Sequence, residues 1–124
     1  MNIVVDASYL IEFLDNPLEK KFQWILDNNL IAPDLLKYEY NNVLLNKCKN
    51  TALAGQFRDV IYSLPIEYVD ITGYEEKIYS LATEQKLSFY DASYLFVAID
   101  RGLPIATCDS QILQATKALN VSTM

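Results

Sequence analysis

The chain has 124 residues, of which 52% are hydrophobic, and 16 acidic against 10 basic side chains give it a net charge of −6. This length suits one globular domain with a real core, and the composition excludes a disordered chain. The negative charge argues against loose, charge-driven binding to nucleic acid, although it leaves room for a local basic track beside an acidic site.

Two residue types are scarce enough to exclude whole classes of chemistry. There is no histidine, which rules out Ser-His-Asp and Cys-His nucleophile systems and zinc sites ligated by histidine. The three glycines stand at positions 55, 73 and 102, so no glycine-rich loop is present to cradle a phosphate. Any catalysis therefore has to use carboxylates, hydroxyls, amides and lysines.

The sequence also predicts where the protein works. No apolar run approaches the ~18–20 residues of a membrane span, so we expect no membrane association. Asp6 and Glu12 interrupt any hydrophobic stretch near the N-terminus, and we expect no signal peptide. Cys48 and Cys108 are far apart in no metal-like spacing, and reduced thiols in a cytoplasmic protein are the simplest interpretation.

The N-terminal half alternates short β-branched or apolar runs with helical patterns. Ile3-Val4-Val5 predicts a buried parallel strand that ends at Asp6. The predicted elements are a strand at 3–5, a helix at 7–14 ended by Asn16-Pro17, a helix at 18–28, a strand at 30–32 ending at Pro33, a helix at 35–49 with Asp34 as its N-cap, and a helix at 52–63 with Thr51 as its N-cap.

The C-terminal half continues this alternation. The predicted elements are a strand at 66–71, a turn at Thr72-Gly73, a helix at 74–86, a helix from the Ser88-x-x-Asp91 capping box to Arg101-Gly102, a strand at 103–107, a helix at 110–119 and a closing edge strand at 121–123. Alternating strands and helices predict a single α/β domain over residues 1–124. We expect a central parallel sheet of about four to five strands with helices on both faces.

Four acids stand where such a sheet would gather them. Asp6 and Asp109 each follow a predicted strand, Asp91 lies in the first turn of a helix, and Glu39 lies inside a long helix. Oxygen ligands of this kind suit hard cations such as Mg²⁺ and Mn²⁺. Without a cation, four close carboxylates raise one another's pKa values.

Each acid also has a purely structural explanation. Asp6 and Asp109 could cap the helices that follow them. Asp91 at a helix start suits the helix dipole, and Glu39 could be a solvated helix residue. The combination favours a common site, because two strands end in an acid and Glu39 shares its helix face with Asn42 rather than with lysines.

Four short motifs carry these acids in order along the chain. They are Val4-Val5-Asp6-Ala7-Ser8, then Glu39 with Asn42-Val43-Leu44, then Tyr90-Asp91-Ala92-Ser93-Tyr94-Leu95 with Ala98, and Leu103-Pro104-Ile105-Ala106-Thr107-Cys108-Asp109. Together they resemble the motifs of PIN-domain ribonucleases, and most of all the small VapC-type toxins of prokaryotic toxin–antitoxin (VapBC) pairs. The resemblance covers essentially the whole chain.

The resemblance implies a Mg²⁺- or Mn²⁺-dependent endoribonuclease. It assigns metal binding and catalysis to the acidic quartet Asp6, Glu39, Asp91 and Asp109, and supporting positions to Ser8, Asn42 and Thr107. The expected chemistry is in-line attack of a metal-activated water on a phosphodiester. Many family members carry a further acid shortly after the last aspartate, whereas Ser110 and Gln111 stand here, so a second metal would bind weakly or only with RNA.

The resemblance also implies three partners: an RNA substrate, a cognate antitoxin protein and a second copy of the chain. RNA contacts would come from Lys37, Lys47 and Lys49, although a solvated helix face is the simpler explanation for any one of them. The predicted helices at 35–49 and 52–63 are apolar enough to form a homodimer face. An antitoxin would dock near them and reach the acids with a cation.

Other interpretations stay open. A receiver-like signalling domain needs paired acids after the first strand and a lysine after a late one, which fits Asp6 and Asp109 poorly. A haloacid-dehalogenase-type phosphatase needs Asp-x-Asp, and Ser8 takes the second place. A non-catalytic PIN-like scaffold that binds a partner, or a PIN-like RNA-processing nuclease outside a toxin system, is a further alternative.

Overall fold

A computed structural model describes residues 1–15 and 19–124, and the side chains of residues 1–12 and 23–124. Strands and helices alternate as predicted. The elements are β1 Asn2–Val5, α1 Ala7–Asp15, α2 Glu19–Asp27, β2 Asn29–Pro33, α3 Leu36–Lys47, α4 Thr51–Ser63, β3 Ile66–Val69, α5 Glu75–Gln85, α6 Phe89–Arg101, β4 Ile105–Ala106 and α7 Ser110–Leu119.

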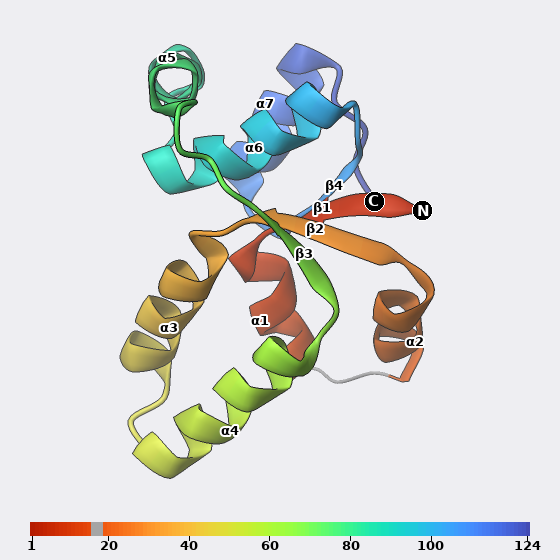
Figure 1. The fold of residues 1–124 in the computed structure, drawn as a ribbon, viewed down its shortest axis with the longest axis vertical. Coiled ribbons are helices and arrows are strands. Elements are labelled where there is room, and N and C mark those ends of the chain that lie inside the picture. Colours follow the sequence, from red (N-terminus) through yellow and green to blue (C-terminus); the bar gives the residue numbers. More distant parts are fainter. Residues whose placement is uncertain (16–18) are drawn as a thin grey trace.

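The strands form one parallel sheet in the order β3-β2-β1-β4. In Figure 1, α5, α6 and α7 lie on one side of the sheet, and α1, α3 and α4 lie on the other. Because both faces of β1 are covered, Ile3, Val4 and Val5 are fully buried. The predicted α/β fold, with a central parallel sheet of four to five strands between two helical layers, is confirmed.

Helix α6 is the centre of one helical layer. Its buried residues are Ala92, Ser93, Tyr94, Leu95, Val97 and Ala98. A helix that is apolar on so much of its surface has to pack against several neighbours at once. Its start is fixed by Ser88, whose hydroxyl accepts from the Asp91 N–H at 3.0 Å, as predicted for the cap. The Ser88 cap and the buried residues of α6 together fix where the helix begins, and with it the position of Asp91.

Two predicted helix starts are wrong. Asp34 does not cap α3; Leu35 stands at the cap position and makes no side-chain cap bond. The N–H of Asp34 instead donates to the Val69 carbonyl at 2.9 Å, because the chain is still held by β3 at this point. Asn50 rather than Thr51 caps α4, with its side chain accepting from the Leu53 N–H at 3.1 Å.

Other predicted boundaries are too long. Helix α3 ends at 47 rather than 49, β3 ends at 69 rather than 71, and β4 covers only 105–106 rather than 103–107. Proline at 104 has no N–H to extend the ladder. The predicted edge strand at 121–123 is a single bridge between Ile105 and Thr123. The predicted break at Asn16-Pro17 and the predicted helix start at Leu18 lie outside the described residues.

None of the helices in the described part of the chain is long and apolar enough to cross a membrane.

Candidate active site

The acids meet at the carboxyl edge of the sheet. Because β1 and β4 are parallel neighbours, Asp6 and Asp109, which follow their ends, come to the same edge. Glu39 reaches this edge from the first turns of α3, and Asp91 reaches it from the first turn of α6. Four separate stretches of sequence therefore contribute one acid each.

Asp6 is only 3% exposed, and three donors hold its carboxylate. Oδ1 accepts from the Ser8 hydroxyl at 2.8 Å and from the Tyr9 N–H at 3.0 Å, and Oδ2 accepts from the Thr107 hydroxyl. The bond from Tyr9 is an N-cap of α1. Asp6 is therefore both a helix cap and a buried member of the acidic cluster.

Ser8 and Thr107 connect Asp6 to the turn after β4. Ser8 Oγ accepts from the Cys108 N–H, and Thr107 Oγ1 accepts from the Asp109 N–H, both at 3.0 Å. Each hydroxyl thus accepts from one backbone N–H and donates to the Asp6 carboxylate. Asp109 in turn caps α7 by accepting from the Ile112 N–H at 2.9 Å. The two hydroxyls therefore fix two of the acids relative to each other.

Glu39 is held from the opposite helical layer. Its Oε2 accepts from the Tyr94 hydroxyl at 3.1 Å, and Tyr94 is fully buried in α6. The sequence alone predicts no role in the site for Tyr94. The signal was present, because a tyrosine inside an otherwise apolar buried run needs a partner for its hydroxyl.

The pKa values of Asp6, Glu39 and Asp91 are raised in part by neighbouring carboxylates. Burial raises the pKa of Glu39 to about 7; the bond from Tyr94 opposes this shift, and the carboxylates of Asp91, Asp6 and Asp109 add to it. Burial also raises the pKa of Asp6 against its hydrogen bonds, with Asp109 adding to the rise. Burial and then Asp109 raise the pKa of Asp91. All four acids therefore lie within electrostatic reach of one another.

Two cavities flank Glu39. One of about 410 Å³ lies between α1 and α3, and Ser8, Glu39 and Lys47 are among its lining residues. The other, of about 350 Å³, lies between α3 and the start of α6. We call it the α3–α6 cavity, and it is lined by Tyr38, Glu39, Asn42, Ser88, Tyr90 and Asp91. Asn42, predicted to support the acids, thus shares a cavity with two of them.

The three lysines predicted to touch RNA are placed differently from one another. Lys47 lines the cavity between α1 and α3. The ammonium of Lys37 stands 4.4 Å from the centre of the Tyr68 ring and lines neither cavity. Lys49 is exposed just after the end of α3. Of the three, Lys47 therefore shares a cavity with one of the acids, Glu39.

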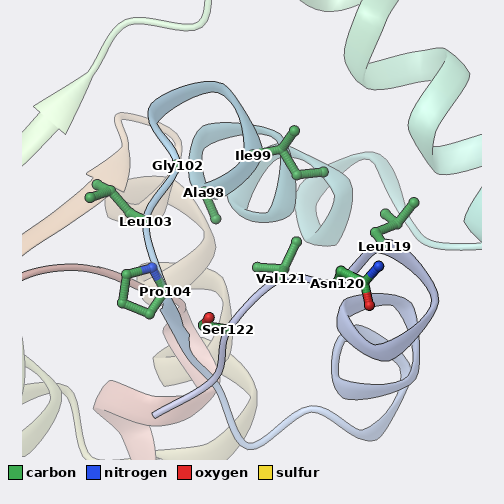
Figure 2. A pocket seen from close by; sticks show the side chains of 9 residues that line it. All are labelled: Ala98, Ile99, Gly102, Leu103, Pro104, Leu119, Asn120, Val121 and Ser122. Carbon is green, nitrogen blue, oxygen red and sulfur yellow. The ribbon is translucent and has the colours of Figure 1, made fainter.

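A third cavity, of about 320 Å³, lies away from the acids (Figure 2). It opens between the end of α6, the start of β4 and the segment after α7, where Gly102, Pro104 and Val121 line it. None of its lining residues carries an ionisable side chain. This cavity is therefore no candidate for acid–base or metal chemistry.

The acidic cluster fits a hard divalent cation in the chemistry of its donors. All four groups offer carboxylate oxygens, which Mg²⁺ and Mn²⁺ prefer, and mutual repulsion among them is what a cation relieves. Among the described side chains, no three acids or thiols already stand close enough to hold an ion. Ion binding would therefore have to draw the carboxylates closer together.

The raised pKa of Glu39 predicts how stability depends on pH when a chelator removes divalent metal. The folded pKa of about 7 lies above the ordinary value of 4.5, so the Glu39 carboxyl stays protonated to a higher pH in the folded chain than in the unfolded chain. Its stabilising effect is present at low pH and is lost as pH rises through about 7. We expect Glu39→Gln to match the wild type at pH 4.5 and to exceed it by about 1–2 kcal/mol at pH 7.5, since solvent screens part of the charge.

Urea unfolding in EDTA at the two pH values measures this difference. Glu84→Gln is the matched control, because Glu84 is exposed on α5 and its substitution should change stability equally at both pH values. An equal effect of Glu39→Gln at pH 4.5 and pH 7.5 would contradict the electrostatic description of the site.

Comparison with known proteins identifies the family. The PIN domain family matches residues 3–118. A curated relative, the exonuclease VapC9 of Pyrobaculum aerophilum, is 42% identical over 50 residues, which are 40% of this chain and 38% of that protein. The aligned region thus spans well under half of the relative's length.

Solved structures share the fold over nearly the whole chain. PAE2754 from Pyrobaculum aerophilum has a TM-score of 0.78 and 26% identity, covering 99% of this chain and 89% of its own. VapC20 of Mycobacterium tuberculosis, a sarcin–ricin loop cleaving toxin, has a TM-score of 0.71 and 20% identity, covering 91% of this chain and 94% of its own. VapBC2 from Rickettsia felis, bound to a promoter DNA fragment, has a TM-score of 0.76 and 13% identity, covering 100% of this chain and 98% of its own. The family match over almost the whole length, together with this shared fold, shows that the chain belongs to the PIN domain family.

Proposed function

We propose that this chain is a Mg²⁺- or Mn²⁺-dependent endoribonuclease and the toxin of a VapBC-type pair. The observation that carries the proposal is the acidic cluster: four acids from separate elements meet at one sheet edge, where burial and then neighbouring carboxylates raise the pKa values of Asp6, Glu39 and Asp91. Repulsion among buried carboxylates is unfavourable for the fold. Binding a cation is the simplest function that would explain why these acids lie together. The relatives named an exonuclease and a sarcin–ricin loop cleaving toxin support a nucleic-acid substrate for this chain.

Asp6, Glu39, Asp91 and Asp109 would hold the cation. When bound, the ion would lower the pKa of a water and neutralise charge on a phosphodiester. Ser8 and Thr107 keep Asp6 and Asp109 in place through the bonds described above. The N-terminus of α6, a helix of 13 residues, adds partial positive charge that favours the Asp91 carboxylate in its first turn.

An internal cut is favoured over removal of terminal nucleotides. Glu39 has an open cavity on each side, one toward α1 and one toward α6. A strand laid along both cavities would pass Glu39 without needing a chain end there. The curated relative is named an exonuclease, and the experiment below separates the two activities.

Two further parts of the proposal concern protein partners. Structural neighbours that are VapBC pairs support a cognate antitoxin for this chain. A homodimer through α3 and α4 is supported by large apolar side chains that face solvent there, with Leu45 72% exposed, Leu53 41% and Val60 38%. Neither partner changes the assignment of the four acids.

A circular single-stranded RNA tests the proposed activity. We expect the purified chain to linearise it in Mg²⁺ or Mn²⁺, because an endonuclease needs no end. Degradation of linear RNA alone would show an exonuclease. No cleavage of either RNA, despite binding, would favour the non-catalytic scaffold. If the chain cuts RNA but its expression does not arrest growth, and a co-expressed neighbouring gene product does not block the cut, the nuclease works outside a toxin system.

A further inference from the structure

We propose that Tyr38 and Tyr90 hold an unpaired nucleobase beside the scissile phosphate, so that the substrate is RNA with unstacked bases at the cut. This inference rests on the proposed nuclease function and adds a specificity-determining pair to it. The base would enter the α3–α6 cavity, and its phosphate would lie over the acids.

The placement of the two tyrosines is the first argument. Each one directly precedes an acid of the site, in Tyr38-Glu39 and in Tyr90-Asp91. They come from different helices and line the same cavity together with those two acids. A group bound between the tyrosines is therefore next to the reacting centre, and it is reached from both α3 and α6.

Exposure is the second argument. Tyr38 is 77% exposed and Tyr90 is 54% exposed, whereas Tyr40 and Tyr94, two and four residues further along the same helices, are fully buried in the core. The rings of Tyr38 and Tyr90 therefore contribute little to the packing of the core. Aromatic rings beside a nucleic-acid site serve as stacking surfaces for bases, and such stacking is worth ~1–3 kcal/mol per base.

The shape and charge of the cavity favour a base over other parts of RNA. Its volume of about 350 Å³ is near the lower end of the roughly 300–1,000 Å³ typical of small-ligand sites. Glu39 and Asp91 in its wall repel a phosphate that no cation neutralises, whereas a neutral ring is not repelled. The Asn42 amide offers both a donor and an acceptor to a base edge. Ser88 is already engaged with Asp91, through the backbone N–H at 3.0 Å and through the side chain, so Asn42 would recognise the base edge.

The experiment measures RNA binding without cleavage. In an Asp109→Asn background, a single-stranded RNA carries 2-aminopurine at the base beside the mapped cut, and its fluorescence reports stacking. We expect Tyr38→Ala and Tyr90→Ala each to weaken binding about 5- to 150-fold, which corresponds to the stacking range, and to lose the fluorescence quenching. Phenylalanine at either position should keep both, because stacking needs the ring and not the hydroxyl.

Tyr79→Ala is the matched control, since Tyr79 is 69% exposed on α5 and lines neither cavity beside the acids. It should bind as the background does. A fully paired duplex of the same sequence should be cut poorly by the wild type. Alanine variants that bind and quench like the background would overturn the inference. A wild type that cuts no RNA would instead remove the proposed function, so the two failures are distinguishable.

Discussion

Replacing Asp91 with asparagine is expected to lower RNA cleavage by about 10²- to 10⁴-fold and to leave the fold intact. The loss follows because removing a carboxylate from a metal site removes several kcal/mol of transition-state stabilisation, at about 1.4 kcal/mol for each tenfold. The fold survives because the start of α6 depends on the Ser88 side chain and the Asp91 backbone N–H. Asparagine keeps that N–H and nearly the same shape.

Asp100→Asn is the control for this substitution. Asp100 lies on the same helix and is exposed, so its loss should leave cleavage within about twofold, as expected for an exposed surface substitution. Single-turnover cleavage of one defined RNA, with circular dichroism to check folding, measures both variants. Equal activity of the Asp91 variant and the wild type would mean that Asp91 is only a helix-start acid.

Chelation of divalent metal is the second change with a large expected effect. EDTA should abolish cleavage, and Mg²⁺ or Mn²⁺ should restore it. Ca²⁺ should restore much less, because it prefers 6–8 oxygen ligands at longer distances than a small octahedral ion does. The same ions should raise the midpoint of thermal unfolding, since a ligand that binds only the folded state stabilises it.

The Glu39→Gln variant separates this effect from a general action of salt. It removes one of the proposed ligands, so its unfolding midpoint should respond less to Mg²⁺ than that of the wild type. The exposed variant Glu84→Gln should respond as the wild type does. Full cleavage in excess EDTA would contradict the metal-dependent chemistry, whatever the stability measurements give.

Local sequence signals were enough for the fold. The β-branched run before Asp6 predicts a buried parallel strand, because only a strand covered on both faces is apolar throughout. The start of α6 was equally readable, since Ser88 and Asp91 have the spacing of a helix cap. Such signals reach only a few residues along the chain, which is the range over which hydrophobic periodicity and capping act.

Boundaries and contacts within the site depend on distant residues, and sequence patterns failed there. Asp34 has the composition of a cap, but its N–H is held by Val69, 35 positions later in the chain. Tyr94 and Glu39 are 55 positions apart. The bond between Cys108 and Ser8 spans 100 positions. The family resemblance named the four acids, whereas the links among them required the folded chain.

A Mn²⁺ binding titration tests the central claim most directly, because it asks whether the acids act as one metal site. Electron paramagnetic resonance of free Mn²⁺ would compare the wild type with Asp6→Asn, Glu39→Gln, Asp91→Asn and Asp109→Asn, and with Asp100→Asn as the control. We predict that the wild type and the control bind Mn²⁺ alike and that each of the four variants binds it at least about tenfold more weakly, as expected when one ligand is lost. Binding that is absent from the wild type, or unchanged in all four variants, would contradict the account.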